Sequence, residues 1–180
     1  GLVDGAVSAM IGVALQEEAS LGVHHLTHDI TPYNTFEASY RLFQTVEYWP
    51  EGTTFVSVVD PGVGSSRKSV VALTKTGQYI VTPDNGTLSY IKKVVGIVAV
   101  REISEVENRR SNTELSYTFH GRDVYAYTGA KLASGHISFE EVGPELPVDK
   151  ILELPVVETI IEDSLVRGAI DILDVRFGSL

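Results

Sequence analysis

The stretch that most constrains the fold is residues 55–68, FVSVVDPGVGSSRK. It begins with an apolar, mostly β-branched run that is typical of a buried strand. The run ends at Asp60-Pro61-Gly62, because proline has no amide hydrogen for a sheet ladder and glycine favours turns. In open α/β sheets, ligands bind beyond the carboxyl ends of strands, so Asp60 and Arg67 are candidate site residues. The alternative is an ordinary strand-end turn with an Asp–Arg surface pair.

Apolar residues recur at helical spacing in three segments, so we expect helices over 7–18, 34–47 and 124–134. Apolar and β-branched runs predict strands over 23–31, 55–59, 70–74, 78–82 and 96–101. The strands on either side of residues 75–77 are expected to form a hairpin. Helices and strands alternate around this hairpin, which favours an α/β domain with a mainly parallel sheet.

A proline-rich stretch near the C-terminal end indicates a domain boundary. Residues 138–156 contain three prolines and are expected to be a linker, followed by a strand over 164–173. We therefore assign residues 1–155 to an N-terminal domain, and 156–180 to the linker exit and first strand of a second domain. The chain also begins without Met, so we expect it to be part of a longer product.

Composition excludes some classes of function. The formal net charge is −10 and is spread along the chain, whereas nucleic-acid binding needs clustered Lys and Arg. Cysteine is absent, which excludes disulfides and thiolate metal sites and fits a reducing compartment. No apolar run reaches the ~18 residues that suggest a membrane span. We expect a cytoplasmic protein that binds neither nucleic acid nor membrane.

Three histidines lie close together at residues 24, 25 and 28. Adjacent strand residues point to opposite faces, so His24 and His25 do not easily share a metal ion. His24 and His28 lie on one face, but two ligands do not make a metal site. Packed or solvated histidines are favoured, and a metal-dependent hydrolase using His24 and His28 is the alternative.

Polar residues that suit chemistry recur at strand ends and helix starts. Asp4 precedes the first helix, Asp60 and Arg67 follow a strand, and His120 precedes Gly121 at the entrance to the third helix. In a wound sheet such loops converge on one edge, where an acid, a guanidinium and an imidazole can meet. Helix-capping roles for Asp4 and for the turn at His120 are the alternatives.

Three motifs carry a resemblance to a known family. VVDPGVGSSR, TPDNGTLS and TFHGRD, in this order and spacing, resemble the S-adenosyl-L-methionine hydroxide adenosyltransferases, or adenosine-forming S-adenosyl-L-methionine hydrolases. These enzymes are relatives of fluorinating and chlorinating enzymes, and the resemblance covers essentially the whole chain. It implies a Rossmann-like N-terminal domain followed by the start of a small β-barrel domain.

The resemblance implies hydrolysis of S-adenosyl-L-methionine to adenosine and L-methionine. Water or hydroxide attacks ribose C5′ and methionine leaves, with no metal or other cofactor. The family's water-activating residues correspond to Asp60, Arg67 and His120. Arg67 would keep Asp60 ionised and directed, and His120 would hold the water or relay its proton. Which of the three accepts the proton stays open.

Four N-terminal-domain residues match substrate contacts of the family. By this resemblance, Asp4 faces the methionine end, and Tyr33 replaces an aromatic residue beside the nucleoside. Thr118 and Phe119 match residues near the ribose and the reacting carbon.

Three further contacts belong to the family's second domain. Asp174 matches a contact toward methionine and Phe177 one toward adenine, while Ser179 stands where the family often has an adenine-contacting Asn. Family members form trimers whose active sites lie between one subunit's first domain and a neighbour's second. The resemblance therefore implies a homotrimer, and the 180-residue chain alone is expected to be inactive.

Other functions compete with hydrolysis. The fluorinating enzyme has Tyr where Asp60 and His120 stand, and an anionic Asp60 would repel a halide, so a 5′-halogenating enzyme is the close alternative. A protein that binds the nucleoside or S-adenosyl-L-methionine without turnover is another. A dinucleotide-binding enzyme is disfavoured because no G-x-G-x-x-G follows a first strand, although the family's first strand would precede Gly1.

Overall fold

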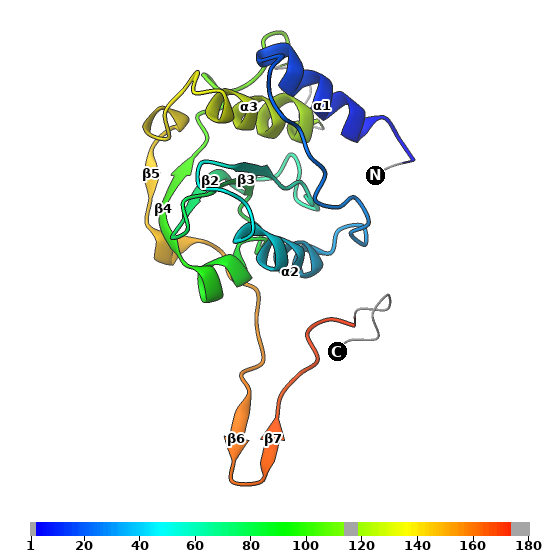
Figure 1. Ribbon diagram of the computed structural model, residues 1–180, viewed down its shortest axis with the longest axis vertical. Helices are drawn as coiled ribbons and strands as arrows, with labels where there is room; N and C mark the ends of the chain where they lie inside the picture. Colours follow the sequence, from blue (N-terminus) through cyan, green and yellow to red (C-terminus); the bar gives the residue numbers. More distant parts are fainter. Residues whose placement is uncertain (1–2, 114–118, 174–180) are drawn as a thin grey trace.

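The computed structural model describes residues 3–113 and 119–173. A five-stranded sheet lies between α1 and α3 on one face and α2 on the other (Figure 1). A two-stranded hairpin, β6 (Ile160–Glu162) and β7 (Leu165–Arg167), projects from this body (Figure 1). The predicted α/β class is confirmed. No helix in the described part of the chain is long and apolar enough to cross a membrane.

The three expected helices form close to their predicted bounds. They are α1 (Ala6–Glu17), α2 (Thr35–Val46) and a π-helical segment, η2 (Gly121–Ala126), that continues into α3 (Tyr127–Ala133). Asn34 caps α2, since its side-chain oxygen accepts a 3.0 Å hydrogen bond from the Glu37 amide. A π-helical turn, η1 (Ile91–Val95), precedes the fourth strand of the sheet.

The sheet is mainly antiparallel, so the expected mainly parallel sheet is wrong. Its strands, in the order β1-β3-β2-β4-β5, are β1 (Thr54–Val56), β2 (Ser69–Thr74), β3 (Tyr79–Pro83), β4 (Ile97–Glu102) and β5 (Glu145–Leu146). Among the ladders that the described residues form in this sheet, β1–β3 alone is parallel. The short turn at residues 75–77 forces β2 and β3 to be antiparallel, and β2 then separates β3 from β4, which run in the same direction.

Residues 23–31 do not form the expected strand. The segment is irregular, and its apolar residues Val23 and Leu26 are exposed. Its sequence, VHHLTHDIT, offers no continuous apolar face, so little hydrophobic energy is available to hold it against the sheet. The strand propensity of these residues is therefore not enough to form a strand, because no apolar surface of the domain buries them.

The expected linker at 138–156 is partly built into the domain. It contains the 3₁₀ turns η3 (Glu140–Val142) and η4 (Val148–Lys150), and between them β5 pairs with β4. Phe139, Val142 and Ile151 are buried in the core. Prolines are tolerated here because β5 is an edge strand. The domain boundary at residue 155 stays a prediction.

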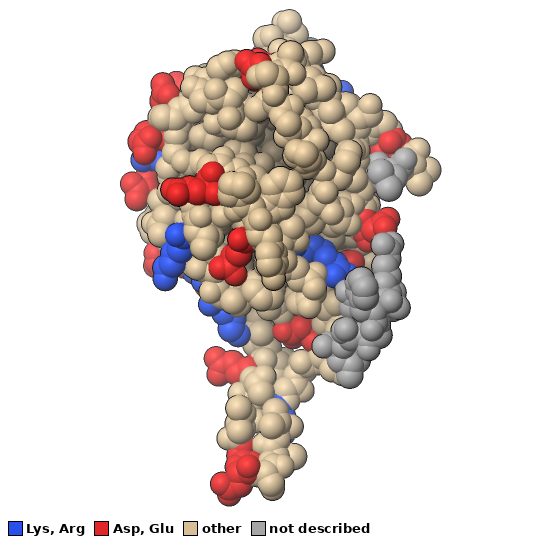
Figure 2. All heavy atoms as spheres, viewed as in Figure 1, with Lys and Arg blue, Asp and Glu red and all other residues tan. Residues whose placement is uncertain are grey.

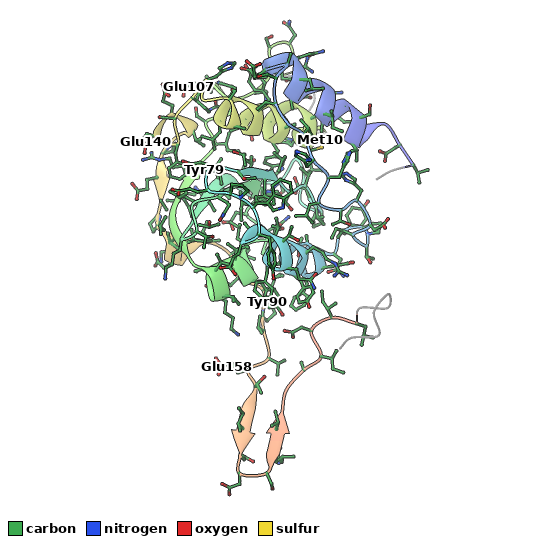
Figure 3. All side chains as sticks on the ribbon, viewed as in Figure 1. Met10, Tyr79, Tyr90, Glu107, Glu140 and Glu158 are labelled. Atoms are coloured by element: carbon green, nitrogen blue, oxygen red, sulfur yellow. The ribbon has the colours of Figure 1, made fainter. Side chains whose placement is uncertain are left out.

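Beyond this segment, the described chain forms a hairpin. Strand β6 (Ile160–Glu162) pairs with β7 (Leu165–Arg167), so the strand expected over 164–173 is shorter than predicted. The chain then returns toward the domain, where the Tyr90 hydroxyl donates a hydrogen bond to Asp171. Figure 3 shows Tyr90 at the base of the domain, above the hairpin.

Alternating residues of the central strands build two cores. Val70 and Ile80 pack with Leu42 and Val46 of α2, while Val71 and Val81 pack on the opposite side with residues of η2 and α3. This is the two-residue period of a strand covered on both faces. The central strands β2 and β3 are consequently buried on both faces.

Candidate active site

Asp60 and Arg67 form a buried, bidentate ion pair in the loop between β1 and β2. Arg67 Nε donates to Asp60 Oδ1 at 2.9 Å and Arg67 Nη2 to Asp60 Oδ2 at 2.5 Å. Their side chains are only 9% and 6% exposed. Gly62 permits this fold-back, because a Cβ there would lie 3.2 Å from Arg67 Cγ, and Gly64 adopts a φ of +80°. The pair is therefore more than a solvated surface contact.

The guanidinium of this pair is kept charged by its surroundings. Burial alone would lower the pKa of Arg67, but the hydrogen bond to Asp60 and the negative charge around it raise that pKa above its ordinary value. A guanidinium that stays protonated gives the carboxylate a fixed direction and a fixed partner.

Ser69 and Tyr125 extend the contacts of Arg67 toward η2. Arg67 Nη1 donates to Ser69 Oγ at 2.9 Å, and Ser69 Oγ lies 3.0 Å from the Tyr125 hydroxyl. The guanidinium also lies over the Tyr125 ring, 5.6 Å from its centroid. Burial raises the pKa of Tyr125, so the phenol remains protonated and able to donate. Strand β2 and helix η2 are thus joined through one polar cluster.

His120 lies at the other end of this cluster and is buried, with 5% of its side chain exposed. Its Nε2 is 3.4 Å from Glu105 Oε1 and 3.3 Å from Arg109 Nη2, and Glu105 and Arg109 form an ion pair. Glu105 Oε1 is also 3.5 Å from Ser69 Oγ, at the limit of a hydrogen bond. A chain of contacts therefore joins the Asp60–Arg67 pair to His120.

The sequence analysis missed four members of this cluster as site residues. They are Ser69, Glu105, Arg109 and Tyr125. The only local signal was the opposite charge of Glu105 and Arg109 at a four-residue spacing within a polar stretch. The three residues singled out from their motifs, by contrast, do belong to one contact network.

The second motif, TPDNGTLS, supports the loop after β1 that carries Asp60. Asn85 Nδ2 donates a 2.8 Å hydrogen bond to the carbonyl of Val59, and Asn85 Oδ1 accepts one of 2.6 Å from Thr87 Oγ1. Asp84 accepts a 3.0 Å bond from the Leu152 amide, and burial raises its pKa. The motif is therefore a turn that connects β1 with the segment beyond β5.

The other predicted contacts within the described chain lie at exposed positions. Asp4 Oδ1 accepts a 2.9 Å hydrogen bond from the amide of Ala6, the first residue of α1, although the N-cap position itself is Gly5. Tyr33 is 75% exposed and has a φ of +67°, which is unusual for a bulky residue. Phe119 is half exposed, with the Arg122 guanidinium 4.9 Å from its ring centroid. Their substrate contacts stay predictions.

Four residues predicted to contact substrate lie outside the described part of the chain. They are Thr118, Asp174, Phe177 and Ser179. Their contacts also stay predictions.

The three clustered histidines contact each other or an aromatic ring. His25 Nδ1 lies 2.7 Å from His28 Nε2, and the His24 ring centroid is 5.4 Å from that of Trp49. Burial, and then the neighbouring His25, lowers the pKa of His28. Within residues 3–113 and 119–173, no three His, Asp or Glu side chains are grouped as metal ligands. His24 and His28 are not on one strand face, since the segment is not a strand.

Charge is distributed over the surface without a dominant basic region on the visible face. Figure 2 shows Asp and Glu side chains scattered over that face among fewer Lys and Arg. This distribution matches the negative net charge of −10.

Comparison with known proteins identifies the family. The (R)-S-adenosyl-L-methionine hydrolase of Methanocaldococcus jannaschii is 36% identical over 155 residues, which cover 83% of this chain and 57% of that protein. An uncharacterized conserved protein from Thermotoga maritima has a crystal structure that matches with a TM-score of 0.89 and 35% identity, over 97% of this chain and 65% of that one. The fluorinase of Actinoplanes sp. (strain N902-109) is 26% identical over 204 residues, covering all of this chain and 67% of that protein.

The chain thus spans 57% of the length of the M. jannaschii relative. Residues 1–143 match the family described as the SAM hydroxide adenosyltransferase N-terminal domain, where SAM is S-adenosyl-L-methionine. The match includes all three motifs of the sequence analysis and the whole polar cluster around Arg67. The chain therefore belongs to the SAM hydroxide adenosyltransferase family.

Proposed function

We propose that this chain belongs to an enzyme that hydrolyses S-adenosyl-L-methionine to adenosine and L-methionine. The observation that carries the proposal is the buried bidentate pair of Asp60 and Arg67, joined through a polar cluster to His120. The name of the M. jannaschii relative, (R)-S-adenosyl-L-methionine hydrolase, supports the same substrate.

The reaction is a nucleophilic displacement at ribose C5′. A water oxygen forms a bond to C5′ while the C5′–sulfur bond breaks, and the bonding electron pair goes to sulfur. Methionine leaves as a neutral thioether, adenosine carries the new hydroxyl, and one water proton passes to a base. Because the sulfonium is already a good leaving group, the enzyme mainly has to align and desolvate the water.

We propose that three residues position and activate this water: Asp60, Arg67 and His120. Asp60 orients the water through its carboxylate, and Arg67 fixes the direction of that carboxylate through two hydrogen bonds. His120 holds the water's other side or relays its proton. An ordinary carboxylate is a weak base toward water, so alignment is the larger contribution of Asp60.

Substrate binding by the N-terminal domain is proposed for four residues. Asp4 binds toward the methionine end and Tyr33 stacks beside the nucleoside. Thr118 and Phe119 lie near the ribose and the reacting carbon. The exposure of Tyr33 and Phe119 supports this assignment, since both rings are accessible to a ligand.

The remaining contacts are proposed to come from a second domain. Asp174 contacts methionine, while Phe177 and Ser179 contact adenine. We propose a Rossmann-like first domain, a small β-barrel second domain and a cytoplasmic homotrimer with each site between subunits. No cofactor takes part in the proposed reaction. Analytical ultracentrifugation of the full-length protein tests the trimer, and an active monomer would refute the shared site.

A product assay tests the proposed function. The full-length protein is incubated with S-adenosyl-L-methionine, with and without chloride, and the products are separated by chromatography. We expect adenosine and methionine, unaffected by chloride. Asp60→Asn should reduce their formation, whereas Asp149→Asn, which changes an exposed carboxylate, should not.

Two other outcomes would replace the proposal. A 5′-halogenated adenosine would assign the protein to the halogenating relatives. Tight binding of S-adenosyl-L-methionine without any product would indicate a binding protein, and Asp60, Arg67 and His120 would then be structural residues.

A further inference from the structure

The segment 84–90 contacts the chain where it leaves the domain for the β6–β7 hairpin. Asp84 Oδ1 accepts a 3.0 Å hydrogen bond from the Leu152 amide, and Ser89 Oγ accepts one of 2.8 Å from the Leu154 amide. In an extended chain, groups two residues apart lie on the same side, so both amides are directed at this segment. The outgoing leg is therefore held at two points.

Side-chain packing adds to this attachment. Gly86 has a φ of +97°, and a Cβ there would lie 2.5 Å from Leu154 Cδ2, so the glycine leaves room for the leucine side chain. Ser89 is 5% exposed and donates a 2.6 Å hydrogen bond to the Gly86 carbonyl. Its oxygen is therefore fixed in the position from which it accepts the Leu154 amide.

The returning leg is held by the next residue of the same segment. The Tyr90 hydroxyl donates a hydrogen bond to Asp171, and the Tyr90 amide donates one of 2.9 Å to Ser39 Oγ of α2. The Tyr90 ring stacks with that of Phe43 at 5.8 Å between centroids, and meets the Phe36 ring edge-on at 5.5 Å. Helix α2 thus fixes both the backbone and the ring of Tyr90, and the hydroxyl is a well-placed donor for the returning chain.

We infer that residues 84–90 are the anchor that fixes both legs of the β6–β7 segment to the first domain. Asp84, Ser89 and Tyr90 act as positioning residues, because they set where the chain leaves this domain and where it returns. Their three contacts join residues between 65 and 81 positions apart in the sequence, so they form a tertiary attachment rather than a local turn.

The consequence of the anchor for substrate binding rests on the proposed function. Contacts with methionine and adenine are proposed for Asp174, Phe177 and Ser179, and the first of these follows Asp171 by three residues. The anchor therefore sets where these contacts lie relative to the loop of Asp60. A weaker anchor should raise KM and leave kcat nearly unchanged, because the residues that align the water keep their places.

Hydrogen–deuterium exchange of the full-length protein tests the anchor without reference to the reaction. Peptides that cover residues 151–155 report the exchange of the Leu152 and Leu154 amides by mass spectrometry. Asp84→Ala and Ser89→Ala should each speed this exchange by about 5-fold or more, because each removes a hydrogen bond that protects one of these amides. Asp84→Asn keeps an acceptor oxygen and should retain the protection.

Glu158→Gln is the matched control on the outgoing leg. Glu158 is exposed and follows the anchored residues, on the part of the leg that Figure 3 shows below the domain. Its substitution should change neither the exchange of residues 151–155 nor KM.

A double-mutant cycle tests the returning leg. Tyr90→Phe removes the hydroxyl but keeps the ring among its aromatic neighbours, and Asp171→Ala removes the acceptor. Each should raise KM for S-adenosyl-L-methionine by about 5-fold, and the double variant should be no worse than either single one, because both remove the same bond. Tyr40→Phe, whose ring lies 5.8 Å from that of Tyr90, is the control and should leave KM unchanged.

Two results would overturn the inference. One is an exchange rate at residues 151–155 that is the same in the parent, Asp84→Ala and Ser89→Ala. The other is a cycle in which Tyr90→Phe and Asp171→Ala leave KM unchanged or have effects that add in full. If the parent forms no product, the proposed function fails, whereas the exchange experiment still decides whether the anchor exists. Dissociation constants for S-adenosyl-L-methionine then replace KM in the cycle.

Discussion

Asn85 donates a 2.8 Å hydrogen bond from its side-chain amide to the backbone carbonyl of Val59, the residue immediately before Asp60. The bond crosses from the turn after β3 to the segment after β1, and these two strands pair in parallel. β1 ends at Val56, so Val59 lies beyond its ladder. The position of Asp60 therefore depends on a residue that makes no contact with the ion pair itself.

Asn85→Ala should lower both stability and activity. The Val59 carbonyl loses its partner, and a lost hydrogen bond of this kind costs about 0.5–1.5 kcal/mol of unfolding free energy. We expect kcat to fall as well, because a displaced carboxylate no longer aligns the water. Urea unfolding and product assays measure the two effects.

Thr87→Val is the matched control for this prediction. It removes the 2.6 Å bond from Thr87 to Asn85 but leaves the Asn85–Val59 bond available. Its stability should fall by a similar amount with a smaller loss of kcat. Equal losses of kcat in both variants would contradict a specific role for the bond to Val59.

Arg67→Met should destabilise the fold strongly. It leaves the Asp60 carboxylate buried without its cation, and breaking a buried ion pair in this way costs about 3–5 kcal/mol. Lys68→Met is the control, since Lys68 and Glu102 form a partly exposed pair, and surface pairs are worth about 0–1 kcal/mol. Denaturant midpoints that shift equally in the two variants would show that the Asp60–Arg67 pair is not effectively buried.

Stability should fall in alkaline solution because of Tyr125. Burial raises the pKa of this phenol in the folded protein, while the unfolded chain retains the ordinary value of about 10. Above that pH the unfolded state loses a proton that the folded state keeps, so stability decreases as pH rises. Tyr125→Phe should make this decrease shallower.

Urea midpoints measured between about pH 8 and 11 test the contribution of Tyr125. Tyr90 contributes in the same direction, since burial, and then its hydrogen bond to Asp171, raise its pKa. A double Phe variant should therefore have the shallowest slope. A slope that is identical in all variants would assign the alkaline loss to other groups.

The sequence predicted the elements whose patterns are local. Asn34 begins α2 through its own side chain, and the apolar stripe from Phe36 to Val46 lies along one helix. Such signals lie within a few residues of each other and do not depend on the rest of the fold. The strand predicted over 55–59 also forms, but as β1 it ends at Val56, so Asp60-Pro61-Gly62 lies in the following loop and does not mark the strand end.

Glu105 and Arg109 were not predicted as site residues because their loop is shaped by distant parts of the chain. Asn108 Nδ2 donates a 3.0 Å hydrogen bond to the Val142 carbonyl, and the Arg110 amide donates one of 3.0 Å to the Asp123 carbonyl. The sequence of residues 102–117 has no regular hydrophobic period, so it gives no basis for predicting these long-range contacts.

The mainly parallel sheet was a wrong prediction for a related reason. Alternating helices and strands favour strands that are joined by helical crossovers and therefore run parallel. In the structure, β2 instead lies between β3 and β4 and is antiparallel to both. The position of a strand within a sheet depends on which neighbours bury its two faces, and the order of elements does not determine it. The sequence therefore predicts the hairpin turn at residues 75–77, but it does not predict where this hairpin lies within the sheet.

Gly129→Ala should destabilise the protein, whereas Gly12→Ala should not, although both glycines lie within helices. A Cβ at Gly129 would lie 2.6 Å from Val56 Cγ2, so α3 would have to move away from β1, the strand that leads to Asp60. Overpacking of this kind typically costs about 1–3 kcal/mol. Gly12 of α1 has no atom within 4 Å of the added methyl group, and replacing an unhindered helical glycine stabilises by about 0.5–1 kcal/mol. Thermal unfolding of the two variants measures the difference, and a Gly129→Ala protein as stable as its parent would show that α3 and β1 are not closely packed.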